Sequence, residues 1–211
     1  MTPGHPIGNF QPAVSAGSGS TPRMTNTLMQ HQVLFVQGGG KATHDQRDNQ
    51  LVDSLRLALG DGHQICYPRM PNEDEPSHAS WRPAIERELA AMRDDAVLVG
   101  HSVGGTILLK TLTGRSPYTC GAIFLLAAPF VGDGGWPSDE IEFSANLGAQ
   151  LPEGVPVHLW HGLDDDIVPP SHADLYARAI PQAQVHRLPG RDHQFNNDLA
   201  DLAATIRSLP G

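Results

Sequence analysis

The sequence contains few cysteines and few lysines. Its two cysteines, Cys66 and Cys120, are too few to cross-link a secreted scaffold, and neither belongs to a Cys-x-x-Cys pair. We therefore expect two buried, reduced thiols. Lysine accounts for two of the 14 cationic residues, against 23 Asp and Glu. Because the net charge is −9 and no basic stripe is present, nucleic acid is not expected as a partner.

Long apolar runs are also absent. No segment approaches the ~20 consecutive apolar residues of a membrane-spanning helix, so no contact with a membrane is expected. The first 30 residues lack a charged start followed by the ~7 to 15-residue apolar core of a secretory signal. These absences predict a cytoplasmic protein.

The chain of 211 residues divides into a tail and one domain. Fifteen of the first 30 residues are Gly, Pro, Ser or Thr, and such a segment buries little apolar area. We predict a flexible N-terminal tail at residues 1–30. Residues 31–211 are long enough to form one domain with a buried core.

After the tail, short apolar runs alternate with segments of helical periodicity. Strands are expected at residues 33–37, 64–67, 96–100, 122–127, 155–160 and 184–188. Helices are expected at residues 48–59, 81–92, 103–112, 171–180 and 196–209. This alternation predicts an α/β protein of three layers, α/β/α, with a mostly parallel sheet of about six strands. In such sheets the ligand lies at the carboxyl ends of the strands.

The motif Gly-x-Ser-x-Gly follows the third expected strand, with Ser102 at its centre. On a tight turn from strand to helix, the central serine has a strained backbone and its hydroxyl projects above the sheet. Glycine suits the crowded positions Gly100 and Gly104. The pattern predicts a nucleophilic serine.

A serine nucleophile needs a base and an orienting acid. When the serine lies on a turn of this kind, the chain order is Ser, then the acid, then His. His193 follows the sixth expected strand. It comes after the acid loop and at a junction between a strand and a helix, in contrast to His101, His158 and His161. The chain order therefore favours His193 as the base. The acid loop after the fifth strand offers three carboxylates, among which composition does not choose: Asp164, Asp165 and Asp166.

Three glycines, at positions 38 to 40, follow the first expected strand. Acyl transfer needs two backbone N–H donors for the developing oxyanion. One belongs to the residue after the nucleophile, Val103, and the other to the loop after this first strand. No histidine pair has zinc-helix spacing, so neither a metal nor a cofactor is expected.

Over residues 31–209 the chain resembles the α/β-hydrolase superfamily, and most closely its small, cap-less serine hydrolases of the retinoblastoma-binding-protein type. The resemblance rests on GHSVGG at residues 100–105, HGLDDDIVP at 161–169, GRDHQFNN at 190–197, and a Met-Pro…Trp segment at 70–81. In the superfamily the acid falls three residues after the glycine of a His-Gly pair, which implies Asp165. The oxyanion residue of the superfamily commonly follows a second His-Gly pair, and in this chain Gln37-Gly38 stands in the place of that pair. The resemblance therefore implies Gly39, with Gly38 and Gly40 as alternatives. Residues 130–154 are too few for a large cap.

Together these features predict a serine esterase that acts on a small-molecule acyl substrate. The expected triad is Ser102, His193 and Asp165, with Gly39 and Val103 forming the oxyanion hole. Trp136 and Phe143 are candidates either for the wall of an acyl pocket or for ordinary packing. An amidase or thioesterase on the same triad is an alternative, as are a peroxide-dependent activity and a hydrolase-fold protein that binds a ligand or partner with negligible turnover.

Overall fold

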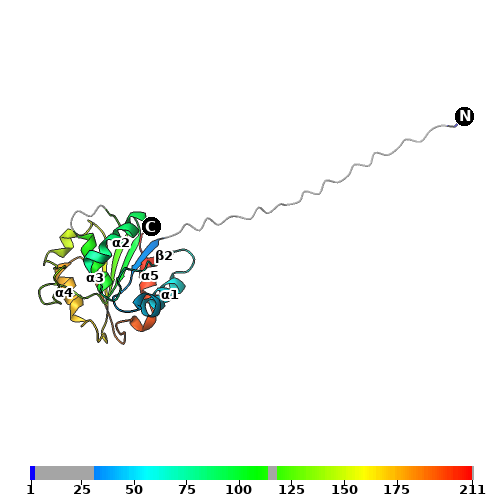
Figure 1. The fold of residues 1–211 in the computed structure, drawn as a ribbon. Helices are drawn as coiled ribbons and strands as arrows, with labels where there is room; N and C mark the ends of the chain where they lie inside the picture. The colour runs from blue at the N-terminus through cyan, green and yellow to red at the C-terminus, as the bar shows by residue number, and fades with distance from the viewer. Residues whose placement is uncertain (3–30, 114–117, 211) are drawn as a thin grey trace.

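The computed structural model describes residues 1–2, 31–113 and 118–210 (Figure 1). The tail predicted at residues 1–30 lies, beyond its first two residues, outside the described residues. The six expected strands are all present. They are β1 (Gln32–Val36), β2 (Gln64–Cys66), β3 (Val97–His101), β4 (Ala122–Leu126), β5 (Val157–Gly162) and β6 (Gln184–Leu188).

These strands form one parallel sheet in the order β2-β1-β3-β4-β5-β6. The chain runs outward from β1 to β2 and then returns to the other side of β1 to form β3. The strand order therefore reverses between β1 and β3. In such sheets, ligands bind beyond the carboxyl ends of the strands at the point of reversal.

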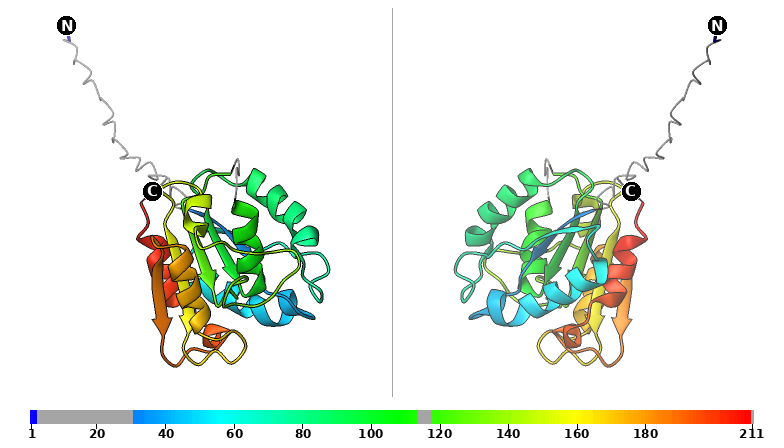
Figure 2. Two further views of the ribbon diagram at one scale, coloured as in Figure 1. Left: turned by 90° about the vertical axis from the view of Figure 1, so that its left-hand side faces the viewer. Right: turned by 90° about the vertical axis from the view of Figure 1, so that its right-hand side faces the viewer.

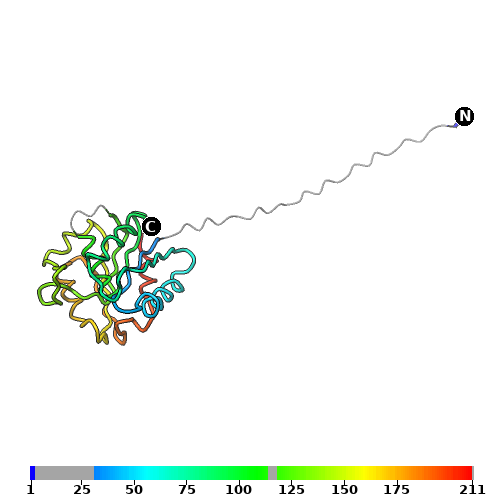
Figure 3. The backbone as a smooth tube through the Cα atoms, viewed as in Figure 1, coloured from blue at the N-terminus to red at the C-terminus, as the bar shows by residue number. Residues whose placement is uncertain are grey.

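Helices cover both faces of the sheet, as the views in Figure 2 show. α1 (Asp48–Leu59) and α5 (Ala200–Arg207) lie side by side on one face. The backbone trace in Figure 3 shows that these two segments are neighbours in space although they are far apart in the sequence. The other face is covered by α2 (His78–Ala91), α3 (Val103–Leu112) and α4 (Ser171–Ala179). The predicted three-layer α/β/α fold is confirmed.

Two apolar cores fill the spaces between these layers, because successive strand residues point to opposite faces. Along β1, Val33 and Phe35 pack toward α1 and α5, whereas Leu34 and Val36 pack toward the other helices. All four side chains are fully buried. A strand has to be apolar at the positions that are buried on either face, as Val33 to Val36 are.

The segment between β4 and β5 adds no separate cap. It holds one short 3-10 helix, η2 (Leu147–Gln150), and buries Phe143, Leu147 and Leu151 in the core beneath α3 and α4. Among the described residues, no helix is long and apolar enough to cross a membrane.

Several boundaries differ from the prediction. β5 begins two residues later and continues through Gly162, because the backbone stays paired with β6. α2 begins earlier, at His78, where the Ser77 hydroxyl caps the helix by accepting a hydrogen bond from the Ser80 N–H.

Besides η2, two further short helical turns were not predicted. η1 (Thr43–Arg47) is a π-helical turn that leads directly into α1. η3 (Phe195–Asn197) stands where the last helix was expected to start, and its residues have positive φ angles. Because an α-helix needs negative φ, the last helix begins only at Ala200. Of the two cysteines, Cys120 is buried, whereas Cys66 is only half-buried, and both are free thiols.

Candidate functional site

Ser102 occupies the turn between β3 and α3. Its φ of 52° and ψ of −134° lie outside the regions that residues other than glycine normally adopt, which is the strained conformation predicted for it. The two flanking glycines are required by space. A Cβ on Gly100 would lie 2.4 Å from Gly105 Cα, and a Cβ on Gly104 would lie 1.9 Å from the carbonyl oxygen of Gln37.

The structure brings His193 and Asp165 to this serine. His193 Nε2 lies 3.1 Å from Ser102 Oγ, and His193 Nδ1 lies 2.9 Å from Asp165 Oδ2. Because an ionised carboxylate only accepts hydrogen bonds, Nδ1 carries the ring proton and Nε2 is left to accept the serine proton. Ser102 follows β3, Asp165 follows β5 and His193 follows β6. The ends of these three strands therefore meet at one point, although Ser102 and His193 lie 91 residues apart in the chain.

Asp165 is buried and held by four donors. Oδ1 accepts hydrogen bonds from the N–H groups of Ile167 and Val168, both at 2.9 Å. Oδ2 faces His193 and also His161 Nε2, at 3.2 Å. Burial acts to raise the pKa of Asp165, but the hydrogen bonds from His161 and His193 outweigh it and hold the pKa well below its usual range. The other two carboxylates considered, Asp164 and Asp166, are exposed.

The competing histidines have other partners. His101 Nδ1 lies 2.9 Å from a carboxylate oxygen of Asp48. His158 stacks on Phe124, and burial lowers its pKa to about 4. His161 supports Asp165, a role that the sequence analysis missed. The available signal was its position in the sequence: His161 lies near the end of β5, four residues before Asp165, which follows that strand.

Two of the three glycines after β1 already use their N–H groups. Gly38 N donates to Asp48 Oδ2 at 2.6 Å, and Gly40 N donates to the Glu73 carbonyl at 2.6 Å. Within the described part of the chain, the N–H of Gly39 has no acceptor. Of the three candidates, Gly39 alone therefore presents a free amide.

The second candidate donor lies beside Gly39. Val103 is the first residue of α3, so its N–H has no partner within the helix. A Cβ on Gly39 would lie 2.9 Å from Val103 Cγ1 and 2.5 Å from Pro76 Cγ, which shows how closely the Gly39 backbone approaches these two side chains.

The side chain of Gln37 fixes the conformation of the glycine loop. Its buried side chain donates from Nε2 to Glu73 Oε2 at 2.7 Å and to the Gly38 carbonyl at 3.3 Å, and its Oε1 accepts from Met70 N at 3.0 Å. The Gly38 carbonyl belongs to the same peptide unit as the Gly39 N–H, and in a trans peptide the two point in opposite directions. Holding that carbonyl inward therefore turns the Gly39 N–H outward.

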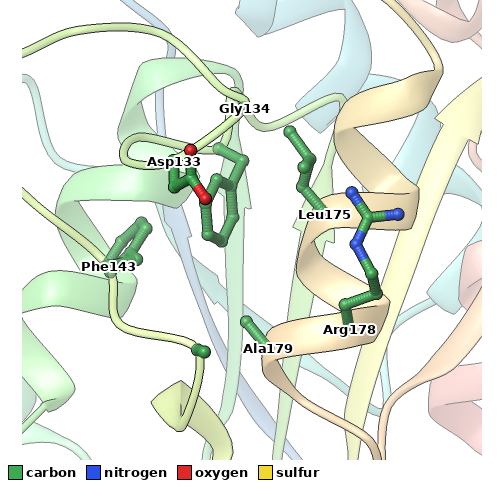
Figure 4. Close-up of a pocket in the computed structure, with 8 residues that line it drawn as sticks. Asp133, Gly134, Phe143, Leu175, Arg178 and Ala179 are labelled. Carbon is green, nitrogen blue, oxygen red and sulfur yellow. The ribbon is translucent and has the colours of Figure 1, made fainter.

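A cavity of about 290 Å³ lies between α4 and the segment after β4 (Figure 4). Leu175, Arg178 and Ala179 of α4 form one side, and Phe143 lies across from them. Phe143 thus lines a cavity and packs into the core, whereas Trp136 is 40% exposed, stacks edge-on against His172 and does not line this cavity.

A second cavity of about 310 Å³, lined mostly by polar residues, lies beside His193, between the acid loop and η1. Neither cavity is lined by Ser102 or Asp165. In the described ranges, no group of three or more His, Cys, Asp or Glu side chains is arranged to hold a metal ion.

Solved structures with the same fold share little sequence with this chain. The ydeN gene product of B. subtilis has a TM-score of 0.66 at 18% identity, over 84% of this chain and 99% of that one. An esterase from Rhodococcus sp. has a TM-score of 0.66 at 16% identity, over 85% and 91% of the two chains. A serine hydrolase without a lid from Xanthomonas campestris has a TM-score of 0.58 at 19% identity, over 86% and 84%.

Among curated proteins, none matches this chain in sequence. The narrower resemblance to the retinoblastoma-binding-protein type stays a prediction. A family model described as serine hydrolase matches residues 56–198, more than half of the chain, and this span includes Ser102, Asp165 and His193. The chain therefore belongs to the serine hydrolase family of α/β-hydrolases, and it is a hydrolase.

Proposed function

We propose that this protein hydrolyses acyl esters of small molecules through an acyl-enzyme formed on Ser102. The observation that carries the proposal is the unbroken series of hydrogen bonds from Ser102 Oγ through the His193 ring to Asp165. All of this chemistry falls within the domain predicted at residues 31–211.

In the first half-reaction, Ser102 Oγ attacks the carbonyl carbon of the ester and its proton passes to His193 Nε2. The negative charge that develops on the carbonyl oxygen is stabilised by the N–H groups of Gly39 and Val103. The tetrahedral intermediate then breaks its bond to the alcohol oxygen, which takes the proton from His193 and leaves as the alcohol.

In the second half-reaction, water takes the place of the alcohol. His193 accepts a proton from water as the water oxygen attacks the acyl carbon, and then returns this proton to Ser102 Oγ as the acid departs. Asp165 keeps the His193 ring in the required tautomer and stabilises its charged form. No cofactor enters either step.

Two features support an ester as the substrate. Esterases occur among the solved structures of this fold, including the Rhodococcus protein. In this chain the segment that would form a cap is packed into the core, and the Ser102 side chain is partly exposed. A small acyl ester can approach such a serine without the opening of a lid.

The test is labelling with a fluorophosphonate probe together with a series of p-nitrophenyl esters of increasing acyl length. We expect wild type to be labelled and to hydrolyse esters, Ser102→Ala to do neither, and Ser171→Ala, an exposed serine at the start of α4, to behave as wild type. Labelling without ester turnover would move the substrate to amides or thioesters. Ester turnover by Ser102→Ala equal to that of wild type would refute the proposal.

A further inference from the structure

A second buried acid–histidine pair, Asp48 and His101, lies next to the triad. Asp48 is the first residue of α1 and His101 is the last residue of β3, directly before Ser102. Their side chains are 0% and 1% exposed, and Asp48 Oδ2 lies 2.9 Å from His101 Nδ1. The reaction described above uses neither side chain.

Both ring nitrogens of His101 face acceptors. Nδ1 faces the Asp48 carboxylate, and Nε2 lies 3.0 Å from the backbone carbonyl of His193. A neutral imidazole has only one N–H, so two donated hydrogen bonds require the charged imidazolium. The pair is therefore a buried ion pair, with Asp165 as the further carboxylate that acts on His101.

The pKa shifts agree with this assignment. Burial acts to lower the pKa of His101, but the charge and hydrogen bond of Asp48 outweigh it and raise the pKa. For Asp48, burial acts to raise the pKa, and the charge and hydrogen bond of His101 together with the N–H of Gly38 bring it below its usual value.

The ion pair connects three segments of the site. Asp48 Oδ2 accepts from Gly38 N at 2.6 Å, one residue before the free amide of Gly39. His101 precedes Ser102 in the chain and holds the carbonyl of His193. Asp48 Oδ1 also accepts from Gln194 Nε2 at 3.4 Å, the residue after His193.

Stability alone is a weak reason for such a pair. Replacing a buried ion pair with well-packed apolar residues is often neutral or stabilising, because both charges lose their hydration. The contacts made by this pair are instead directed at the backbones that carry the base, the nucleophile and the oxyanion donor.

We propose that the Asp48–His101 ion pair is a positioning device that holds the backbones of His193 and of the Gly38–Gly39 segment around Ser102. The pair touches no reacting atom. It acts through the backbone groups that it holds, which are the N–H of Gly38 and the carbonyl of His193. The inference rests on the proposed function for its effect on the rate, but its charge state can be tested separately.

Asp48→Asn is the sharpest variant because it keeps the shape of the side chain. An amide oxygen in the place of Oδ2 still accepts from Gly38 N and from one protonated ring nitrogen. Without the negative charge, His101 loses its second proton, and Nε2 no longer donates to the His193 carbonyl. We expect a roughly 10- to 100-fold loss in kcat, because small displacements of an aligned catalytic group have effects of this size.

The kinetic test compares kcat and KM on the best p-nitrophenyl ester, with active sites counted by fluorophosphonate titration. We expect KM of Asp48→Asn to stay within about twofold of wild type, since the lost interaction acts in the transition state. Asp53→Asn, on the exposed side of α1, should leave both constants unchanged. Leu55→Ala, buried in the same helix, should lower the melting temperature without this loss in kcat per active site. His101→Gln combined with Asp48→Asn should be no slower than the slower single variant.

The charge state is tested by NMR of protein with ¹⁵N-labelled histidine at pH 7.5, with His101→Gln used for assignment. We expect protons on both ring nitrogens of His101 in wild type and on one in Asp48→Asn. A neutral His101 in wild type would overturn the inference, as would an unchanged kcat in Asp48→Asn. If instead Ser102→Ala retained full turnover, the proposed function would fail, and the NMR result would still decide the ion pair.

Discussion

Oδ2 of Asp165 lies 2.9 Å from Nδ1 of His193, while the other oxygen of the same carboxylate is held by two backbone N–H groups. The backbone thus fixes the carboxylate, and the carboxylate fixes the ring. This order of support makes Asp165 the residue through which the geometry of the His193 ring is set.

Asp165→Asn should lower kcat by about 10⁴-fold, because an amide in this place favours the wrong tautomer of the histidine. Asp164→Asn and Asp166→Asn remove exposed carboxylates from the same loop and should retain nearly full activity. The measurement is kcat on a p-nitrophenyl ester for the three variants. A larger loss in Asp164→Asn than in Asp165→Asn would show that the acid has been assigned to the wrong residue.

Gly39→Ala should impair turnover without a change in the triad. The new Cβ would lie 2.5 Å from Pro76 Cγ and 2.9 Å from Val103 Cγ1, so the loop that carries the free amide has to move. We expect kcat to fall by about 10-fold or more, since a displacement near 1 Å can cost about 100-fold. Gly62→Ala, with open space around its Cβ, serves as the control. Equal activity of the two variants would exclude Gly39 as an oxyanion donor.

Asp165 should stay ionised as the pH falls through the usual carboxyl range. Burial acts to raise its pKa, but the hydrogen bonds from His161 and His193 outweigh burial and hold the pKa well below that range. The stabilisation that this charge gives the site should therefore be lost only at a pH below about 4, the ordinary value for an aspartate. The measurement is the ¹³C chemical shift of the Asp165 carboxyl group against pH, with Asp165→Asn used for assignment. Titration of this carboxyl in the usual range would contradict the picture of an Asp165 held in its ionised form.

Gly104→Ala should destabilise the fold, because its Cβ would lie 1.9 Å from the carbonyl oxygen of Gln37, where α3 crosses β1. The atoms that the new Cβ would meet belong to the backbone carbonyls of Gln37 and Val36, so neither group can rotate away. We expect the free energy of unfolding to fall by about 3 kcal/mol or more, at the upper end of the usual cost of overpacking. The check is the midpoint of urea unfolding, with Gly62→Ala as the matched control. A midpoint equal to that of wild type would mean that the helix and strand can move apart at little cost.

The sequence alone determined the layers of the fold, and it predicted Ser102 as the nucleophile. Alternation of apolar runs with helical periodicity is a local property, and so is the crowding of Gly100 by Gly105 in the turn around Ser102. His193 was predicted from chain order, and Asp165 from the resemblance to the α/β-hydrolase superfamily. Element ends were less well predicted, because pairing between β5 and β6 and the positive φ angles of η3 decide them.

Only the tertiary structure decided which groups act on one another. Gly38, Gly39 and Gly40 are equivalent as letters, and they differ because Asp48 and the Glu73 backbone engage two of the three amides. The same holds for His161 beside Asp165 and for the Asp48–His101 pair, whose members lie 53 residues apart in the chain. Local sequence encodes backbone preference and burial, whereas hydrogen bonds between strand ends depend on how the sheet places those ends in space.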